Sequence, residues 1–429
     1  MPLPTAPLQD WLAHIERVHP RAIEMGLDRV ARVRDVLGLA PAFPIFTVGG
    51  TNGKGSACAM LEAILHEAGY KVGTYTSPHI LRYNERVKVA RTQASDAALV
   101  AALAAVDAAR GDTPLTYFEF STLAAMWLFA RERVEVAILE VGLGGRLDAV
   151  NAFDADCALL MSVDLDHMDY LGDTREAIGF EKAGIFRPGK PAICADPQPP
   201  STVLDHAASV GAALLLSGRD FGYTVELRQW RYRGPGLERH GLPHPALRGA
   251  FQIGNAAAVL AALDTMRDKL PVSAADLRTG LLTAENPARF QVLPGVPAVI
   301  LDVAHNPAAA RALAQNLAGM KSSGRTYAVF AMLKDKDIAG VIGAVAARID
   351  EWLIAPSEGP RGADADTLKA ELTRAGVFEA LSVHDNVAAA YSQACERAGQ
   401  NDRIVVFGSF STVAAVMAAR AAGSRGRAR

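Results

Sequence analysis

Residues 49–56 have the composition of a loop that binds phosphate groups. This glycine-rich segment follows a short apolar run and precedes an Ala/Leu-rich stretch of helical period. Glycines let backbone N–H groups crowd around phosphate oxygens, the N-terminus of the following helix adds partial positive charge, and Lys54 adds a full one. The order strand, loop, helix is the context that a phosphate cradle requires. We therefore predict that ATP phosphates bind here, at Asn52, Gly53, Lys54, Gly55 and Ser56.

This loop departs from the strict pattern G-x-x-x-x-G-K-[ST] at two positions. Gly55 separates Lys54 from Ser56, and Val48 occupies the place of the first glycine. The usual assignment of the serine hydroxyl to Mg²⁺ therefore does not transfer directly, and other metal ligands must be sought. The alternative is a glycine-rich turn that binds nothing, but it would leave Lys54 without a purpose.

The size and charge of the chain limit the kind of protein that carries this loop. With 429 residues, 50% of them hydrophobic, the chain exceeds what one core usually supports, so two or three domains are expected. A net charge of -2 gives no overall positive field that would attract nucleic acid or an anionic membrane. Small-molecule ligands and a monomer, with neither nucleic acid nor membrane as a partner, are the expectation.

Features related to cellular location favour the cytoplasm. The first twenty residues lack the basic start and apolar run of a signal peptide. No stretch approaches the roughly 18 to 20 apolar residues that span a bilayer. The four cysteines are widely scattered in apolar surroundings, so we interpret them as core residues of a protein in a reducing compartment.

The elements that must position the loop alternate between short apolar runs and stretches of helical period. This alternation is typical of parallel strands joined by crossover helices. Residues 221–233 alternate apolar and polar side chains and end at Gly-Pro-Gly, which predicts an antiparallel hairpin. In the first part of the chain we expect strands at 44–48, 134–140, 158–163 and 191–195, and helices at 57–68 and 122–131.

A domain boundary is expected within residues 286–297, which contain three prolines and a glycine, and a second domain follows it. Its predicted strands are 298–302, 326–332, 351–355 and 403–408. The prediction is thus an α/β protein with a P-loop ATPase-like domain at 1–292, built on a mostly parallel sheet, and a smaller Rossmann-like domain at 293–429.

Four motifs in this chain resemble the folylpolyglutamate synthase and dihydrofolate synthase family. They are TNGKGS at 51–56, TSPH at 76–79, EVGLGGRLD at 140–148 and LDVAHNP at 301–307, and the match spans nearly the whole chain. The wider relatives are the Mur ligases, which share the fold and the chemistry but not the Ser-Pro-His loop. The resemblance implies that ATP phosphorylates a carboxylate of dihydropteroate or a folate, and that the amine of L-glutamate then displaces phosphate.

Metal ions are part of what this resemblance implies, because the phosphoryl-transfer centre is strongly anionic and needs positive charge. The family's Mg²⁺ positions, for two ions, fall on Ser77, Glu140 and His167. Glu140 and His167 each follow a predicted strand, so both would face the carboxyl edge of the sheet. Magnesium prefers oxygen ligands, which suits His167 least. The neighbouring residues Asp164, Asp166 and Asp169 rank below Glu140 as metal ligands. They could instead cap a helix or orient the ligands.

The resemblance also implies catalytic roles for Lys54, Lys182 and His305. Lys182 matches a lysine that carbon dioxide carbamylates in relatives, and a carbamate would suit a site with two Mg²⁺ ions. The alternative is an exposed pair of Glu181 and Lys182 on a helix. His305 is assigned to the glutamate or phosphate region, and the alternative is that it caps the helix starting at Pro307.

Three segments correspond to the family's dihydropteroate-binding positions. The aromatic rings of Tyr117 and Phe118 could stack on a pterin while polar groups pair with its edge, or both rings could be ordinary core residues. The first segment favours dihydrofolate synthase activity in addition to chain extension. The acceptor positions are Leu27, Asp28, Arg29 and Val30, then Thr116, Tyr117, Phe118 and Glu119, then Leu147, Asp148 and Ala149. Further nucleotide positions fall on Asn255, Arg289 and Asp302.

Two other functions remain open at this point. One is a Mur-type ligase that adds an amino acid to a sugar–peptide precursor of the cell wall, and the loop from Ser77 to His79 disfavours it. The other is a regulator that binds a nucleotide without making a bond. Three metal ligands would exceed what such a regulator needs.

Overall fold

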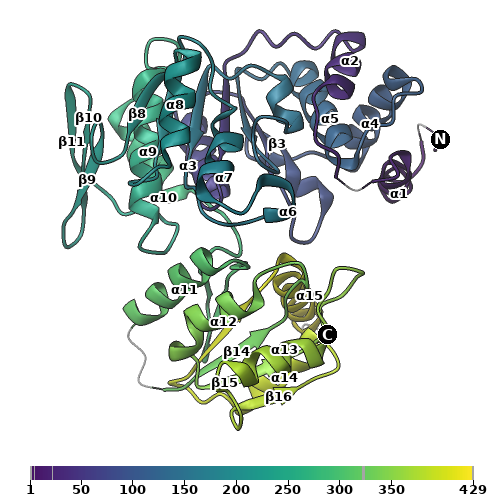
Figure 1. Ribbon diagram of the computed structural model, residues 1–429, viewed down its shortest axis with the longest axis vertical. Helices are drawn as coiled ribbons and strands as arrows, with labels where there is room; N and C mark the ends of the chain where they lie inside the picture. The colour runs from purple at the N-terminus through teal and green to yellow at the C-terminus, as the bar shows by residue number, and fades with distance from the viewer. Residues whose placement is uncertain (1, 4, 22, 321–323, 428–429) are drawn as a thin grey trace. The chain divides into compact units, whose positions relative to one another are not determined.

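The computed structural model describes residues 2–3, 5–21, 23–320 and 324–427, in two compact units (Figure 1). The first unit comprises Met1–Ala246 and Ile253–Glu285, and the second comprises Leu247–Gln252 and Asn286–Arg429. The division at Asn286 precedes the boundary expected after residue 292. The short segment Leu247–Gln252, which the sequence pattern does not single out, belongs to the second unit.

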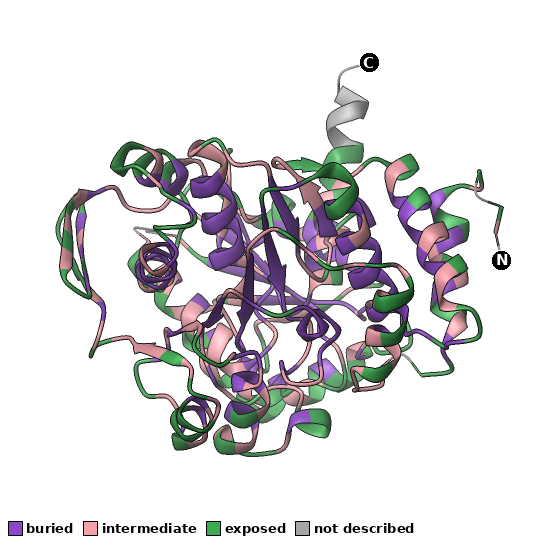
Figure 2. Ribbon diagram, turned by 90° about the horizontal axis from the view of Figure 1, so that it is seen from above, coloured by how far each residue is buried: buried purple, intermediate pink, exposed green. Residues whose placement is uncertain are grey.

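An eight-stranded sheet in the order β4-β3-β2-β5-β1-β6-β7-β8 forms the centre of the first unit. The six strands from β2 to β8 in this order, β2-β5-β1-β6-β7-β8, pair in parallel, whereas β3 and β4 pair antiparallel at one edge. This confirms the predicted mostly parallel sheet. Its central strands are fully buried, as both faces of a parallel sheet require (Figure 2). The strands are β1 (Ile45–Gly49), β2 (Val72–Tyr75), β3 (Val87–Val89), β4 (Thr92–Gln93), β5 (Val136–Glu140), β6 (Cys157–Leu160), β7 (Pro191–Cys194) and β8 (Ala213–Leu216).

Helix α3 (Lys54–Glu67) follows the glycine-rich loop and begins at Lys54, earlier than the predicted residue 57. It is buried almost all round, because it packs on the sheet and also on α10 (Ala274–Thr283). Gly280 permits the close approach of α10, since a Cβ there would lie 2.5 Å from the Ile64 Cα. The other helices of this unit are α1 (Leu8–Val18), α2 (Asp28–Val36), η1 (Tyr83–Arg86), α4 (Asp96–Arg110), α5 (Tyr117–Glu132), η2 (Ala149–Ala152), α6 (Met168–Leu171), α7 (Arg175–Ala183), α8 (Ser201–Val210) and α9 (Gln252–Thr265).

The predicted antiparallel hairpin is present, but it has a third strand. Strands β9 (Gly222–Val225) and β10 (Trp230–Gly234) pair as expected, and the Gly-Pro-Gly sequence turns the chain into β11 (Leu237–Leu242). The sequence pattern misses β11 because Glu238, Arg239 and His240 interrupt any apolar alternation.

The second unit has a six-stranded sheet in the order β12-β13-β17-β14-β15-β16, parallel except for β12. This confirms the Rossmann-like prediction, and Phe330, Trp352 and Phe407 pack together in its core. The elements are β12 (Gln291–Leu293), β13 (Ala298–Leu301), α11 (Pro307–Gly319), β14 (Thr326–Phe330), α12 (Ile338–Val345), η3 (Ala346–Arg348), β15 (Glu351–Ile354), α13 (Ala365–Arg374), β16 (Leu381–Val383), α14 (Val387–Arg397), β17 (Arg403–Phe407) and α15 (Phe410–Arg427).

Two expectations about composition have structural answers. Cys58, Cys157 and Cys194 are buried, but Cys395 is exposed, so the prediction that all four cysteines are core residues is wrong for Cys395. Among the helices that the structure describes, none is long and apolar enough to cross a membrane.

Candidate functional site

The predicted phosphate loop joins β1 to α3, and two of its glycines are required by its backbone. Gly53 precedes α3 with a φ of 89°, and a Cβ there would lie 3.0 Å from the Asn255 Oδ1 atom. Gly50 has a φ of 136°, and its Cβ would lie 3.0 Å from the Ser162 nitrogen. Both conformations favour glycine. Because α3 begins at Lys54, the N–H groups of its first turn lie at the helix N-terminus, where an anion is stabilised.

The loop is fastened to the segment that follows β6. The Thr51 N–H donates to the Ser162 carbonyl at 2.8 Å, and the Thr51 hydroxyl bonds both the N–H and the carbonyl of Asp164 at 3.0 Å. The Lys54 ammonium donates to the carbonyls of Gly50 at 2.9 Å and Thr51 at 3.2 Å. Lys54 therefore lies over the loop itself, where a bound phosphate would compete with these two carbonyl groups for the ammonium.

Two of the three predicted metal ligands lie together. Glu140 ends β5 and is only 3% exposed, and its Oε2 accepts the Ser77 N–H at 3.1 Å. Parallel pairing of β2 with β5 brings the residues after β2 to this edge of the sheet. The Glu140 carboxylate and the hydroxyl of the serine whose N–H it accepts are oxygen donors of the kind that Mg²⁺ prefers.

The third predicted ligand, His167, precedes α6 in a left-handed conformation with a φ of 52°. Its Nε2 lies 3.9 Å from the Asp166 Oδ1. Among the described residues, no group of three or more His, Cys, Asp and Glu side chains is arranged to hold a metal ion. The participation of His167 in a metal site therefore stays a prediction.

Lys182 is a buried lysine at the end of α7, with an exposed fraction of 4%. The alternative of an exposed Glu181–Lys182 pair is therefore wrong, and Glu181 instead pairs with Arg146 at 2.7 Å. Burial first, and then the charge of Lys54, lower the pKa of Lys182 to about 7, against the opposite influence of Asp166 and Asp148. A substantial neutral fraction follows at neutral pH, and only a neutral amine attacks carbon dioxide.

Asp148 shapes the glycine-rich turn that follows β5. Its carboxylate accepts the N–H groups of Gly142 and Leu143 at 3.0 and 2.8 Å and that of Val150 at 3.0 Å. Burial raises the pKa of Asp148 to about 7, although these three hydrogen bonds oppose the shift. The side chain predicted to bind the acceptor thus holds the turn together.

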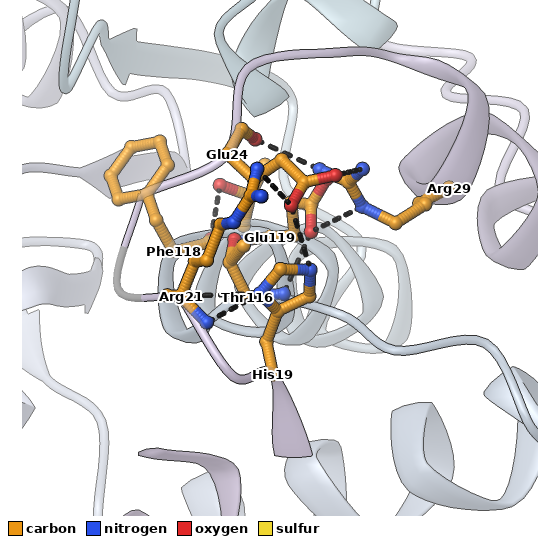
Figure 3. A network of polar contacts seen from close by, with 8 residues as sticks. His19, Arg21, Glu24, Arg29, Thr116, Phe118 and Glu119 are labelled. Atoms are coloured by element: carbon orange, nitrogen blue, oxygen red, sulfur yellow. Dashed lines mark hydrogen bonds and ion pairs between the residues drawn. The ribbon is translucent and has the colours of Figure 1, made fainter. Parts of the chain in front are cut away.

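The three predicted acceptor segments lie side by side. Arg29 pairs with Glu119 and with Glu24, each at 3.0 Å (Figure 3). The Gly26 N–H donates to the Leu147 carbonyl at 3.4 Å. The Glu119 carboxylate also accepts the Thr116 N–H at 2.7 Å and so closes the capping box that begins α5. The Glu119 carboxylate therefore binds both the Arg29 side chain and the Thr116 backbone.

Other acceptor positions differ in how much surface they offer. Val30 and Ala149 have their side chains in the core, so only their backbones are available to a ligand. Tyr117 and Phe118 are half-buried and pack against that core, so neither is a fully buried core residue. The Phe118 ring points away from the Glu24–Arg29 network (Figure 3). Leu27 immediately precedes α2, and Asp28 is exposed in its first turn.

In the second unit, the predicted Asp302 and His305 follow β13, and Arg289 precedes β12. Asp302 accepts the N–H groups of Phe290 and Ala304, and burial raises its pKa to about 6 although the charge of Arg289 lowers it. The Arg289 guanidinium lies 5.1 Å from the centroid of the Phe410 ring, and the His305 ring lies 6.2 Å from it.

The alternative that His305 caps α11 is wrong. Asn306 is the capping residue, and its Oδ1 accepts the Ala309 N–H at 2.9 Å. The His305 Nδ1 instead lies 2.8 Å from the Val303 carbonyl oxygen, which fixes the ring close to the end of β13.

Both units match family models of the Mur ligases. Residues 48–263 match the Mur ligase middle domain, and residues 288–410 match the Mur ligase glutamate ligase domain. With a phosphate-type loop between β1 and α3 and a separate Rossmann-like unit, the chain is a member of the Mur ligase class.

Within this class, the chain belongs to the dihydrofolate synthase/folylpolyglutamate synthase family, which confirms the resemblance inferred from its motifs. It is 46% identical over 417 residues to the dihydrofolate synthase/folylpolyglutamate synthase of Escherichia coli, with 97% of this chain and 96% of that protein covered.

Solved structures of this family superpose closely. The structure of E. coli FolC in complex with DHPP and ADP is 45% identical, with a TM-score of 0.94, and 99% of this chain and 100% of that chain are covered. A bifunctional folylpolyglutamate synthase/dihydrofolate synthase with Mn, AMPPNP and L-glutamate bound is 46% identical, with a TM-score of 0.91, and the coverage is 98% and 99%.

Proposed function

We infer that this chain is an ATP-dependent ligase of folate biosynthesis that forms amide bonds to L-glutamate. It acts on 7,8-dihydropteroate as a dihydrofolate synthase and on folates as a folylpolyglutamate synthase. The observation that carries this inference is a phosphate-type loop with Lys54, next to the buried Glu140 and its hydrogen-bonded partner Ser77, in a chain of this family.

The reaction follows from the chemistry of the substrates. A carboxylate is a poor electrophile, and transfer of the ATP γ-phosphoryl group turns one of its oxygens into a leaving group. The glutamate amine then attacks the acyl phosphate carbon, and phosphate leaves as the amide forms. Lys54 and the N–H groups at the start of α3 stabilise the negative charge on the transferred group.

Ser77 and Glu140 are the residues that would hold Mg²⁺, with His167 as a further proposed ligand. The bound ion supplies positive charge to the phosphates during transfer. Asn52, Gly53, Gly55, Ser56 and Asn255 are proposed to contact the nucleotide. Arg289 and Asp302 are further proposed nucleotide contacts, and His305 is proposed to act on glutamate or phosphate.

A carbamate on Lys182 is part of the proposal. The neutral amine attacks carbon dioxide, a C–N bond forms, and one proton is released to solvent, which leaves a carboxylate-like group. Burial lowers the pKa of Lys182 to about 7, so the reactive neutral form is present at neutral pH. A carbamate signal from the enzyme under labelled carbon dioxide in ¹³C NMR, lost in Lys182→Arg, tests this modification.

The pterin of the acceptor is proposed to lie against Tyr117 and Phe118, at the junction of the three segments that Arg29, Glu119 and Leu147 connect. The enzyme is proposed to act as a monomer in the cytoplasm. The described cysteines are all unpaired, which agrees with a reducing compartment.

One assay tests the function. The purified chain is incubated with ATP, Mg²⁺ and either dihydropteroate, tetrahydrofolate or a muramyl precursor, each with and without L-glutamate. The expected result is glutamate-dependent ADP release with both pterin acceptors, together with a glutamylated product. Amide formation with the muramyl precursor, or ADP release that needs no acceptor, would overturn the proposal.

A further inference from the structure

Arg86 is a buried arginine that has no carboxylate partner in the part of the chain that the structure describes. It ends η1, is 9% exposed, and forms no ion pair with any carboxylate among the residues that the structure describes. Its Nε–H donates to the His79 Nδ1 at 2.8 Å. Its guanidinium carbon lies 5.3 Å from the centroid of the Tyr117 ring and 5.7 Å from that of Tyr83. A full positive charge is therefore enclosed by two aromatic rings and an imidazole.

The carboxylate adjacent to Arg86 in sequence does not neutralise this charge. Glu85 accepts three backbone N–H groups of its own loop, from Ile80 at 2.7 Å, Leu81 at 2.9 Å and Arg82 at 2.8 Å. A buried charge that lacks a partner destabilises the folded state. Proteins retain such destabilising features mainly where function requires them.

His79 adds a second donor to this site. Because its Nδ1 accepts the Arg86 N–H, the proton of the neutral ring resides on Nε2. The remaining N–H groups of Arg86 and the Nε2–H of His79 are all donors. A group that only accepts hydrogen bonds and carries negative charge complements them, and a carboxylate has both properties.

The position of Arg86 connects this donor pair to both the proposed metal pair and the acceptor segments. The Thr76 N–H donates to the Arg86 carbonyl at 2.9 Å, and the next residue, Ser77, bonds to Glu140. On its other side, Arg86 contacts Tyr117, which begins α5. A ligand group bound to Arg86 would thus lie near the reacting end of an acceptor whose pterin contacts Tyr117.

We propose that Arg86 and His79 bind the carboxylate of a glutamylated folate that does not react. This inference rests on the proposed function. Dihydropteroate has one carboxylate, and the reaction consumes it. A folate that bears glutamate has two, so one reacts and the other needs a partner. Arg86 is then a specificity residue for chain extension and is dispensable for the first glutamylation.

Substitution of Arg86 tests the proposal with two acceptors. Arg86→Gln removes the charge, and Arg82→Gln is the matched control because that neighbouring side chain is 66% exposed. The KM for tetrahydrofolate is expected to rise roughly 10- to 100-fold in Arg86→Gln, the loss expected for hydrogen bonds to a charged group. The KM for dihydropteroate and both kcat values stay within about threefold. Arg86→Lys should restore part of the loss, and His79→Ala should show a smaller rise for tetrahydrofolate alone.

Two other results would contradict the proposal. An equal rise in KM for both acceptors would show that Arg86 serves the shared pterin site, and no rise would show that it binds neither. Either result overturns the proposal. If the wild-type chain glutamylates neither acceptor, the proposed function fails instead, and binding of folate against pteroate, measured by thermal shift, still decides the role of Arg86.

Thermal unfolding of the ligand-free chain tests the role of Arg86 without an activity assay. If Arg86 awaits a ligand, its replacement by methionine removes an unpaired buried charge, and the midpoint of thermal unfolding stays equal or rises. Folate should then stabilise the wild type more than Arg86→Met. A marked fall in the unfolding midpoint would show that Arg86 is a structural residue, and the proposal would be wrong.

Discussion

The hydroxyl of Ser162 bonds both polar backbone groups of Asn52. Its Oγ accepts the Asn52 N–H at 2.9 Å and donates to the Asn52 carbonyl at 3.1 Å. Asn52 belongs to the phosphate loop after β1, whereas Ser162 follows the neighbouring strand β6. The end of one strand therefore fixes the loop of the next, and the Asn52 N–H is already committed to the protein. Backbone contacts to phosphate are expected from the residues that follow Asn52.

Ser162→Ala should weaken ATP binding without changing the binding of the acceptor substrate. Loss of two hydrogen bonds, at about 0.5 to 1.5 kcal/mol each, predicts ATP binding that is weaker by roughly 5- to 150-fold. Calorimetric titration with a nonhydrolysable ATP analogue measures this. Ser209→Ala is the control, because its exposed hydroxyl bonds only within α8. An unchanged dissociation constant in Ser162→Ala would mean that the loop holds its shape without this contact.

Much of the fold is predictable because its signals are local. The apolar runs that become β1, β5, β13 and β17 are fully or largely buried, as an uninterrupted run in a parallel sheet must be. The glycine-rich loop and the start of a helix after it are also local patterns. By contrast, β11 carries mainly polar residues and forms because β10 offers it an edge, which no local pattern reports.

The candidate site is predictable where a motif marks it and unpredictable where partners come from distant segments. Lys54 and Glu140 lie in motifs. Ser162 and Arg86 do not stand out in the sequence, because a serine and an arginine are common and their roles come from contacts formed by folding. The burial of Lys182 is equally invisible, since the helix around it is amphipathic and its buried face depends on what packs there.

Lys54→Ala should abolish phosphoryl transfer while the fold persists. The side chain is half-buried and its ammonium donates to the carbonyls of Gly50 and Thr51 in the loop, so little core packing is lost. Removal of one such charge from a phosphoryl-transfer site predicts a fall in kcat of at least about 100- to 1000-fold. ADP release with each acceptor measures the change, and circular dichroism checks the fold. Lys71→Ala is the control, because Lys71 pairs with exposed Glu132. Normal turnover in Lys54→Ala would remove the loop from the mechanism.

Glu119→Gln should destabilise the first unit. Glu119 is 3% exposed, and its carboxylate is shared by Arg29 and the Thr116 N–H. Gln can still accept the backbone hydrogen bond, but Arg29 then keeps Glu24 as its negatively charged partner and loses Glu119. Breaking a buried pair on one side predicts a loss of about 2 to 4 kcal/mol in the free energy of unfolding, measured with urea. Glu132→Gln, with a partner that is 39% exposed, should change stability by less than about 0.5 kcal/mol.

The double variant Arg29→Met with Glu119→Gln separates the ion pair from the capping box. If the unpaired Arg29 charge causes the loss, its removal should recover part of the stability. A double variant less stable than Glu119→Gln by the full effect of Arg29→Met alone would show that the two side chains are not coupled.

Lys182 should make the stability of the fold depend on pH in a defined direction. Burial lowers its pKa to about 7 in the folded chain, below the value near 10.4 of an unfolded lysine. Between these values the unfolded chain binds a proton that the folded chain lacks, so this site raises stability as pH increases from about 7 to about 10.

Lys182→Met removes this pH-dependent contribution to stability. Without carbon dioxide, the variant should therefore be more stable than the wild type at pH 7 and below. Its advantage should shrink by up to about 1.4 kcal/mol per pH unit above that. Urea unfolding across pH 6 to 10 measures both curves, with Lys190→Met as a control for the loss of a lysine. A difference between wild type and Lys182→Met that stays constant over this range would mean that Lys182 holds its proton in the folded protein, and a neutral amine would then not be present to take up carbon dioxide.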